Sequence, residues 1–317
     1  MLAGKRVLIT GGAGFMGTAL AKKLADQNEV MIYDNLHRNA LRNTDLLHHP
    51  HVRFEQADVL DLGQLEKSIQ GATHVVHLAA IAGVDTVLES PVRAMRVNIL
   101  GTVNVLEVAS RLHGLERLVD LSTSEVFGSR AYRVEETHVT SQGSVGEARW
   151  SYAVSKLASE YLAHSYFHEF GLPIVTVRPF NVYGPNQVGV GAVHQFIKKA
   201  LRNEAVEIHG DGSQIRSWCY IDDVVDALLL VLVKPEAVGQ VFNVGNPRST
   251  VTILDLATRI IRLTAASSQA VFTPIGYADV EIRVPSVDKA KTLLGFDAQV
   301  DLDEGLRRTI AWYRSHS

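Results

Sequence analysis

The sequence predicts an α/β fold, in which a doubly wound parallel sheet carries a smaller, interwoven C-terminal part. The first observation behind this is an apolar run at 7–9, of the kind that forms a buried parallel strand. The second is a glycine-rich segment directly after this run, with Gly11, Gly14 and Gly17 and then a helix-like stretch at 18–25. The third is that apolar runs of strand length recur along the first half of the chain, whereas prolines and glycines mark loops beyond it.

The composition is that of an ordinary soluble globular protein. The chain has 317 residues, of which 46% are hydrophobic and 21% charged, and its formal net charge is −3. This length is too great for one small core, so one large domain or two interwoven domains are expected. The acidic balance gives no bulk electrostatic reason to bind nucleic acid or an anionic membrane.

Cysteine usage and hydropathy predict a cytoplasmic location. The single cysteine, Cys219, excludes an internal disulfide framework and suits a reducing compartment. No apolar run is long enough to span a bilayer, and the run at 227–233 predicts a buried helix. The chain enters its first strand within a few residues, which leaves no room for a signal peptide, so we expect no membrane association.

The three glycines predict a dinucleotide site. Gly11 permits a tight turn, Gly14 lets the backbone approach a pyrophosphate, and Gly17 lets the helix pack closely on the strand. The helix N-terminus would present free N–H groups to the anion. A second apolar strand, at 30–33, ends in Asp34, whose carboxylate can accept both ribose hydroxyls. This context favours a nucleotide site over a purely structural turn.

The third strand brings further polar residues toward this site. The polar loop at 35–51 carries His48, His49 and His51 close together, and we expect a solvated loop without a metal because no matching carboxylate or cysteine cluster accompanies them. Residues 52–57 predict the third strand, with Asp58 and Val59 at the carboxyl end, which faces the cofactor in a parallel sheet. Asp58 either contacts the adenine or caps the following helix, and both roles can hold together.

The fourth and fifth strands frame the candidate chemistry. Residues 75–80 predict the fourth strand, whose small residues would let a cofactor pass close by. A helix is predicted over 91–110, and Asn98 within it is either a satisfied core amide or an organiser of the site. Residues 117–122 predict the fifth strand, which leads into polar residues at 123–125, where doubly wound folds place chemistry.

A catalytic pair is predicted on the helix over 151–170, which comes after an expected loop at 129–146. Tyr152 and Lys156 are four residues apart, so they lie on one face of that helix. A phenol with a pKa of about 10 is a poor base at neutral pH. An ammonium one turn away, together with a positive nicotinamide, would lower that pKa. The alternative is an incidental helix pair, and Thr123 at a strand end favours the catalytic interpretation.

The rest of the chain is predicted to form the substrate side. Residues 173–178 predict the sixth strand, which would close the nucleotide-binding sheet. We therefore expect a nucleotide-binding domain at 1–180, joined by part of 215–250, and a substrate-binding domain at 181–317.

Seven motifs together resemble those of the extended short-chain dehydrogenase/reductases, specifically the nucleotide-sugar epimerase, dehydratase and decarboxylase group. They are TGGAGFMG at 10–17, HLAA at 77–80, STSEVFG at 122–128, YAVSK at 152–156, RPFNVYGP at 178–185, GDGSQIR at 210–216 and FNVG at 242–245. The match covers nearly the whole chain, and the set is highly specific. The resemblance implies a Rossmann fold, a tightly held NAD and a nucleotide-sugar substrate, with a UDP-sugar as the first expectation.

The resemblance also implies the reaction chemistry. NAD takes hydride from C4 of the sugar while Tyr152 removes the hydroxyl proton, assisted by Thr123 and Lys156. The 4-keto sugar then epimerises, loses water or loses carbon dioxide, because a ketone stabilises an adjacent carbanion. NADH finally returns the hydride.

Glu125 bears on the choice among these reactions. Simple 4-epimerases of the group usually lack a carboxylate after the catalytic Ser or Thr. A glutamate there resembles the GDP-mannose 4,6-dehydratases, in which it takes the C5 proton, and the UDP-glucuronate decarboxylases. It therefore points to decarboxylation or dehydration. The alternative for Glu125 is a salt-bridged structural carboxylate.

Three arginines and one segment bear on the substrate. Arg149 stands shortly before the catalytic tyrosine, as in the decarboxylases. Residues 279–286 resemble their C-terminal nucleotide-binding segment, with Arg283 on the diphosphate or ribose, and Arg216 matches an arginine near the substrate. A guanidinium binds an oxyanion pair bidentately, which favours phosphate ligands over surface arginines. Residues 81–84 depart from the decarboxylase sequence, in the region that lines the sugar pocket.

The residues predicted at the site form three groups. The catalytic group is Thr123, Glu125, Tyr152 and Lys156. The cofactor-binding group is Gly11, Gly14, Phe15, Met16, Asp34, Asn35, Asp58, Val59, Leu78, Ala79, Ala80, Asn98, Tyr152, Lys156 and Pro179. The substrate-binding group is Ser124, Arg149, Asn181, Val193, Ile208, Arg216 and Arg283.

Cofactor choice and function each keep an alternative. Asp34 favours NAD over NADP because it repels a 2′-phosphate, although His37 and Arg38 leave some room for NADP. The alternative reaction is that of a nucleotide-sugar 4-epimerase, of the UDP-glucose or UDP-glucuronate type. An alternative of another class is a non-catalytic NAD(P)-binding redox sensor or scaffold, which the presence of the full Thr–Tyr–Lys set disfavours.

Two helices also predict an assembly. Those over 91–110 and 151–170 carry apolar residues on more than one face. The apolar residues concerned include Leu157, Tyr161, Leu162 and Tyr166. The resemblance implies a homodimer through a four-helix bundle, and the alternative is burial of these residues within one subunit.

Overall fold

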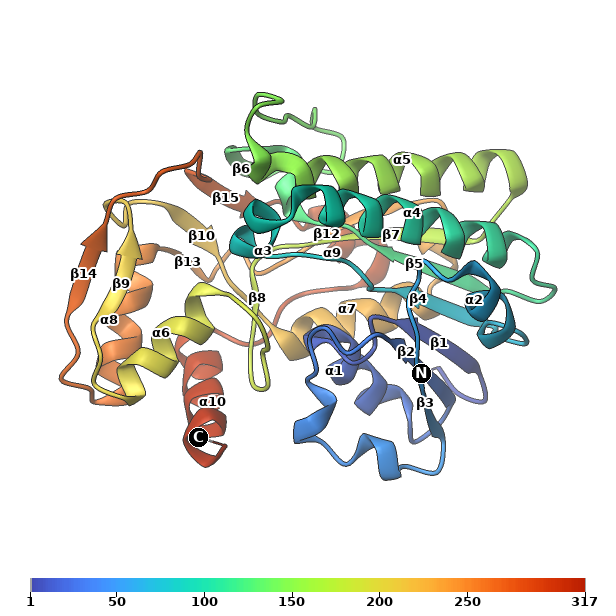
Figure 1. Ribbon diagram of the computed structural model, residues 1–317, viewed down its shortest axis with the longest axis horizontal. Coiled ribbons are helices and arrows are strands. Elements are labelled where there is room, and N and C mark those ends of the chain that lie inside the picture. The colour runs from blue at the N-terminus through green and yellow to red at the C-terminus, as the bar shows by residue number, and fades with distance from the viewer. Residues whose placement is uncertain (1, 317) are drawn as a thin grey trace.

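Seven parallel strands form the central sheet of this computed structural model, which describes residues 2–316 (Figure 1). The strands are β1 (Arg6–Thr10), β2 (Glu29–Asp34), β3 (Val52–Gln56), β4 (His74–His77), β5 (Arg117–Leu121), β7 (Ile174–Pro179) and β12 (Val241–Val244). They are ordered β12-β7-β5-β4-β1-β2-β3, so the direction of winding reverses between β1 and β4. This confirms the predicted doubly wound α/β fold, in which ligands bind at such a reversal.

Helices cover both faces of the sheet. On one face, α1 (Phe15–Leu24) packs beside α7 (Ile221–Val233), and α7 contains the apolar run predicted as a buried helix. The other face carries α2 (Leu62–Ser68), α4 (Pro91–Ser110) and α5 (Ser151–Phe170), with α4 and α5 side by side (Figure 1). The last two helices have the predicted bounds, since Pro91 starts one and a left-handed Gly171 ends the other.

A smaller group of elements lies beyond the carboxyl ends of the sheet strands. Its four-stranded sheet has the order β13-β10-β15-β6, and two strand pairs, β9 with β14 and β8 with β11, accompany it. The strands are β6 (Arg130–Val134), β8 (Val182–Tyr183), β9 (Val206–His209), β10 (Ile215–Ser217), β11 (Cys219–Tyr220), β13 (Thr250–Thr252), β14 (Ala270–Thr273) and β15 (Ile282–Pro285). The remaining helices are α3 (Val84–Glu89), α6 (Ala192–Leu201), α8 (Ile253–Thr264), α9 (Asp288–Leu294) and α10 (Leu302–Ser315).

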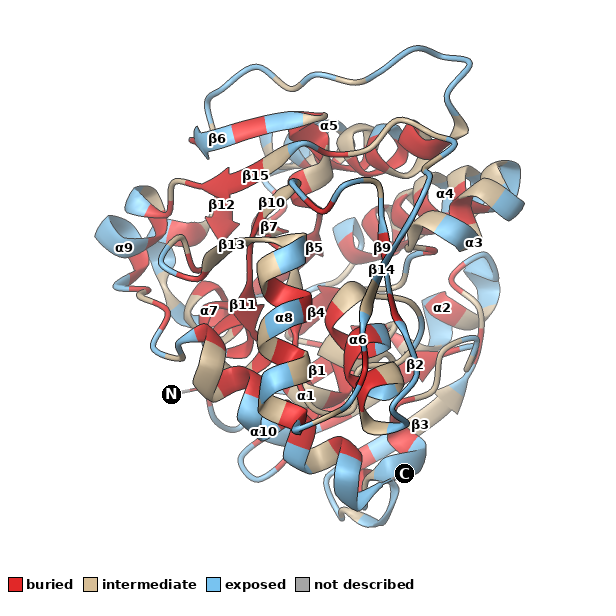
Figure 2. Cartoon of the chain, turned by 90° about the vertical axis from the view of Figure 1, so that its left-hand side faces the viewer, coloured by how far each residue is buried: buried red, intermediate tan, exposed pale blue. Residues whose placement is uncertain are grey.

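Three predicted elements were wrong in extent or role. The loop expected at 129–146 contains β6, which pairs in parallel with β15, and only the part after β6 runs exposed over the molecule (Figure 2). The sheet is not closed by the sixth predicted strand, because β12 pairs beyond β7. The fourth strand ends at His77, three residues earlier than expected. The domain boundary at residue 180 stays a prediction.

In the polar loop after β2, His48 and His51 are exposed and His49 is half-buried. The loop forms two short 3-10 turns, η1 (Leu41–Asn43) and η2 (Leu46–His48). Within residues 2–316 no group of three or more His, Cys, Asp or Glu side chains is arranged to hold a metal ion. None of the helices described is long and apolar enough to cross a membrane.

Candidate active site

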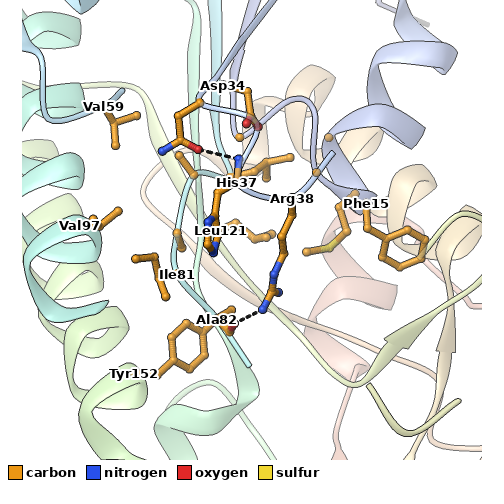
Figure 3. A pocket seen from close by; sticks show the side chains of 18 of the residues that line it. Phe15, Asp34, His37, Arg38, Val59, Ile81, Ala82, Val97, Leu121 and Tyr152 are labelled. Atoms are coloured by element: carbon orange, nitrogen blue, oxygen red, sulfur yellow. Dashed lines mark hydrogen bonds between the residues drawn. The ribbon is translucent and has the colours of Figure 1, made fainter. Parts of the chain in front are cut away.

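A cavity of about 900 Å³ opens at the carboxyl ends of the central strands, where the winding reverses (Figure 3). Most of the predicted cofactor-binding and catalytic residues line it together, with two of the predicted substrate-binding residues, Ser124 and Asn181. They are Gly11, Gly14, Phe15, Met16, Asp34, Asn35, Asp58, Val59, Leu78, Ala79, Ala80, Thr123, Ser124, Glu125, Tyr152, Pro179 and Asn181. The predicted residues outside its lining are Asn98, Arg149, Lys156, Val193, Ile208, Arg216 and Arg283.

The glycine-rich turn forms a cradle that larger residues would fill. Gly11 has a φ of +69°, and a Cβ there would lie 2.6 Å from the backbone nitrogen of Ala79. A Cβ on Gly17 would lie 2.5 Å from the carbonyl oxygen of Gly11, so the start of α1 packs directly on the turn. Gly14 is the N-cap of α1 and has no side-chain capping bond. The free N–H groups of the first helical turn therefore face the cavity, which fits the pyrophosphate of a dinucleotide.

Asp34 and Arg38 lie in different parts of the cavity. The Asp34 carboxylate accepts hydrogen bonds from the backbone N–H of Ala13 (3.0 Å) and of Leu36 (2.7 Å), beside the glycine-rich turn. Burial raises the pKa of this carboxyl, and the two backbone bonds oppose the rise. Arg38 instead reaches across the cavity and donates to the carbonyl oxygen of Ala82 at 2.6 Å (Figure 3). Its guanidinium is therefore held away from the Asp34 carboxylate, where the charge of His37 instead opposes the rise in pKa.

Asp58 lines the cavity but does not cap the helix that follows. Its carboxylate accepts from the backbone N–H of Leu60 (3.0 Å) and from the Asn35 amide (3.1 Å), and it lines the cavity. The residue that caps α2 is Asp61, which accepts from the backbone N–H of Gln64. The capping prediction for Asp58 was therefore wrong, because the chain makes a further turn before the helix starts.

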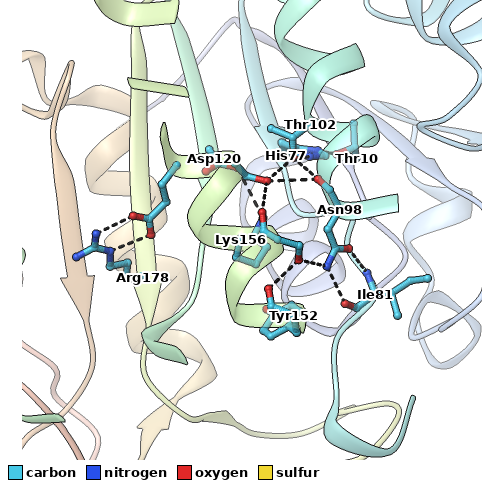
Figure 4. A network of polar contacts seen from close by, with 12 residues as sticks. Thr10, His77, Ile81, Asn98, Thr102, Asp120, Tyr152, Lys156 and Arg178 are labelled. Carbon is cyan, nitrogen blue, oxygen red and sulfur yellow. Dashed lines mark hydrogen bonds and ion pairs between the residues drawn. The ribbon is translucent and has the colours of Figure 1, made fainter. Parts of the chain in front are cut away.

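Asn98 is a fully buried amide that ties the fourth-strand loop to α5 (Figure 4). It exchanges hydrogen bonds with the backbone of Ile81, at 2.8 and 3.1 Å, and it donates to the Ser155 hydroxyl at 2.9 Å. Ser155 in turn donates to the carbonyl oxygen of Tyr152. Asn98 is thus a satisfied core amide outside the cavity lining, and its role as an organiser of the site stays a prediction.

Tyr152 lies in the cavity wall with an unfavourable environment for ionisation. Burial raises its pKa to about 12, with a further contribution from the charge of Glu125, while the Thr123 hydrogen bond and the charge of Arg38 oppose the rise. We expected Lys156 to lower this pKa. In this structure its ammonium lies 3.8 Å from the carboxylate of Asp120 on β5, beneath the cavity floor.

Glu125 is held by two arginines. Arg149, in a 3-10 turn before α5, binds both of its oxygens at 2.5 and 3.0 Å, and Arg283 on β15 approaches to 3.1 Å. Burial alone would raise the pKa of Glu125, but Arg283 and Arg149 outweigh it and lower the pKa to about 2. Glu125 is therefore salt-bridged, as the structural alternative proposed, while it still lines the cavity. Arg283 also donates to the carbonyl oxygen of Gly128.

The other predicted substrate residues are spread over the C-terminal elements. Arg216 on β10 pairs with Asp279 at 3.6 Å, and the Glu125 charge acts on it too. Asn181 lines the cavity and donates to the backbone of Ser217. The two predicted apolar residues on α6 and β9 are fully buried in the main core. These are Val193 and Ile208.

Two residues of the site were not predicted in their present roles. Asp120 stands among apolar residues in the fifth strand, and a charged residue in a buried strand is a signal that sequence analysis can use. The reach of Arg38 across the cavity has no comparable signal, because it depends on a contact with a loop more than forty residues away.

Comparison with known proteins identifies the family of this chain. The family model described as the NAD dependent epimerase/dehydratase family matches residues 7–245. A UDP-N-acetyl-alpha-D-glucosaminuronate decarboxylase of Bacillus cytotoxicus is 33% identical over 98% of this chain and 98% of its own length. A UDP-glucuronate 4-epimerase of Thermodesulfobacterium geofontis is 30% identical over 98% of this chain and 96% of its own length. The chain therefore belongs to the NAD-dependent epimerase/dehydratase family and is an NAD-dependent enzyme of that family.

Solved structures give the same result. The UDP-glucuronic acid 4-epimerase of Bacillus cereus, in complex with UDP-glucuronic acid and NAD, superposes with a TM-score of 0.90 and 30% identity. The superposition covers 98% of this chain and 100% of the Bacillus cereus chain. The fold is thus shared with a solved protein that holds NAD.

Proposed function

We propose that the protein decarboxylates a UDP-hexuronate through a 4-keto intermediate. The observation that carries this proposal is the binding of Glu125 between Arg149 and Arg283 at the edge of the cavity. Substrate class is supported by the relatives, since those with 33% and 30% identity act by name on UDP-uronates.

The chain offers groups for each part of NAD binding. The cradle of Gly11, Gly14 and Gly17 suits the pyrophosphate, and Asp34 suits the adenosine ribose. When bound, NAD supplies the hydride acceptor at C4 and later the hydride donor. Residues of the protein have to orient the sugar and to move the C4 hydroxyl proton.

Tyr152 is our candidate for that proton transfer, with Thr123 as its hydrogen-bonding partner. Deprotonation of a phenol with a raised pKa needs a nearby positive charge. Lys156, one helical turn from Tyr152, can supply part of this charge, and the bound nicotinamide the rest. We assign Tyr152 as the general base of C4 oxidation and as the acid when hydride returns.

The environment of Glu125 favours loss of carbon dioxide over loss of water. Dehydration requires a base that removes the C5 proton, and a carboxylate whose pKa is about 2 is a weak base at neutral pH. Decarboxylation requires no base, because the C6 carboxylate of a 4-keto uronate is β to the ketone. As carbon dioxide leaves, the electron pair moves onto O4, where the hydroxyls of Tyr152 and Thr123 can donate hydrogen bonds.

Glu125 then acts by holding the arginines in place. Three arginines and two carboxylates form this cluster, so it has a net single positive charge. The members are Glu125, Arg149, Arg216, Asp279 and Arg283. Buried guanidinium groups with an excess positive charge favour an anionic substrate, such as a diphosphate or a uronate carboxylate.

The second candidate is a UDP-glucuronate 4-epimerase, which would bind the same anionic sugar. It is supported by the 30% identical relative and by the solved structure from Bacillus cereus. An epimerase would retain the carboxylate and return hydride to the opposite face of the ketone.

A panel of donors separates these proposals. Purified protein with NAD is incubated separately with UDP-glucuronate, UDP-N-acetylglucosaminuronate, UDP-glucose and GDP-mannose. The masses of the products are measured by mass spectrometry. We expect a uronate to lose the mass of carbon dioxide. Loss of the mass of water would show a dehydratase, and an unchanged mass with new sugar NMR signals would show an epimerase. No product from any donor would refute both candidates.

We also propose a homodimer formed through α4 and α5. Tyr161 on α5 is 68% exposed, and Leu100 on α4 and Val154 on α5 are exposed as well. Leu157, Leu162 and Tyr166 of the same prediction are half-buried and pack against core clusters, so burial within one subunit accounts for them. An exposed apolar stripe on two adjacent helices supports a bundle with a second copy.

A cytoplasmic location remains part of the proposal. The single cysteine is a buried, unpaired thiol, which is typical of a reducing compartment. Neither the charge balance nor the site gives a reason to expect nucleic acid as a partner.

A further inference from the structure

A buried carboxylate lies directly beneath the catalytic helix. Asp120 is in β5, has no exposed surface, and is flanked by apolar residues in the strand. Neither of its carboxylate oxygens has a hydrogen-bond donor among residues 2–316. Its partner is the ammonium of Lys156, 3.8 Å away and equally buried (Figure 4). Burial raises the pKa of the Asp120 carboxyl, and the nearby Lys156 ammonium opposes the rise, so the ion pair is what favours a charged carboxylate at this position.

The other titratable groups around this pair are already partnered or neutral. Glu160, one turn further along α5, binds Arg178 of β7 through two hydrogen bonds of 2.9 and 2.6 Å. His77 on β4 lies 2.7 Å from the Thr10 hydroxyl, and burial, reinforced by Lys156, lowers its pKa to about 3. Among the described residues, Lys156 is therefore the cation that compensates Asp120.

Lys156 thus lies near two groups that its positive charge can stabilise, the Asp120 carboxylate and the Tyr152 phenolate. On one side Asp120 attracts its ammonium toward the sheet, and on the other the phenol of Tyr152 lies one helical turn away. The negative charge of Asp120 also acts on Tyr152, where it raises the pKa of the phenol. Both effects make the tyrosinate form harder to reach.

We propose that Asp120 is a positioning residue, which holds the Lys156 ammonium toward the sheet and so makes Tyr152 keep its proton more tightly. The proposal deepens the proposed function, because it rests on Tyr152 as the proton acceptor in C4 oxidation. In this proposal Asp120 sets the pH at which the Tyr152 phenol loses its proton. The measured quantity is the apparent midpoint of tyrosinate formation.

The test uses the Asp120→Asn variant with NAD added, and no sugar. Tyrosinate is followed by its ultraviolet difference absorbance across pH, and the trace of Tyr152→Phe is subtracted to isolate this one phenol. We expect the midpoint to fall by roughly half to one pH unit, since a like charge nearby is removed. Because sugar is absent, this result stands or falls independently of the substrate assignment.

A matched control separates positioning from general loss of a buried carboxylate. Asp223 is also buried, but it accepts backbone hydrogen bonds from Gln299 and Val300 and lies on α7, on the other face of the sheet. Asp223→Asn should lower the melting temperature without moving the tyrosinate midpoint. When a sugar substrate is present, Asp120→Asn should also shift the acidic limb of the pH profile of kcat to lower pH. KM should change little. An unmoved midpoint in Asp120→Asn would overturn the proposal.

A second pair of variants covers the case in which Asp120→Asn does not fold. Lys156→Met leaves a buried carboxylate unpaired, so its melting temperature should fall. Adding Asp120→Leu removes that charge, and the double variant should recover part of the loss. Melting temperatures that fall further in the double variant would show that the two side chains do not act as a pair.

Discussion

The Glu125 ion pairs predict a stability contribution that depends on pH. Two arginines lower the pKa of Glu125 from 4.5 to about 2, and this shift corresponds to about 3 kcal/mol in favour of the folded state. The folded-state pKa is depressed, so the contribution is fully present above about pH 4.5 and is lost as the pH falls toward 2. Glu125→Gln should therefore lose about 3 kcal/mol near neutral pH, because it leaves Arg149 and Arg283 without a carboxylate.

Urea denaturation of both proteins at several pH values measures this difference. The gap between wild type and Glu125→Gln should be widest above about pH 4.5 and should narrow as the wild-type carboxyl becomes protonated. Glu116→Gln is the control, since it removes an exposed ion pair with Lys5 and should cost less than about 1 kcal/mol. A gap that is small at neutral pH, or that does not change with pH, would refute the assignment of Glu125 as an arginine-bound carboxylate.

Three further changes test the cofactor cradle, the base and the assembly. Tyr152→Phe should abolish hydride transfer while NAD still binds, and retained turnover would rule out the phenol as the base. Gly11→Ala should weaken NAD binding in a calorimetric titration, because the new Cβ would meet the backbone of Ala79, whereas Gly114→Ala, with φ of +85° and open space, should leave NAD binding unchanged. Tyr161→Glu should convert the proposed dimer into a monomer in analytical ultracentrifugation; an unchanged sedimentation coefficient would count against the bundle.

Sequence patterns were sufficient for the elements whose signal is local. The two long helices could be bounded because Pro91 and Gly171 mark a start and an end in the sequence itself. The glycine-rich turn with Asp34 was recognisable for the same reason. All of these lie in segments where neighbouring residues determine the backbone.

The features that were missed depend on contacts between distant parts of the chain. β6 has no regular alternation of buried and exposed residues, and it becomes a strand by pairing with β15, about 150 residues later. Arg283 and Glu125, which form an ion pair, are separated by a similar number of residues. The sequence therefore could not decide whether Glu125 is free or salt-bridged. Asp120 was visible as a charge in an apolar strand, but its partner Lys156 is known only once α5 is packed on the sheet.

The fate of the C6 carbon of the sugar distinguishes decarboxylation from epimerisation in a single experiment. UDP-glucuronate labelled with carbon-13 at C6 is incubated with the protein and NAD, and the label is followed by NMR. We expect the label to leave the sugar and to appear as carbon dioxide or bicarbonate, while a UDP-pentose accumulates. Label retained in a hexuronate with an inverted C4 would contradict decarboxylation and establish the 4-epimerase.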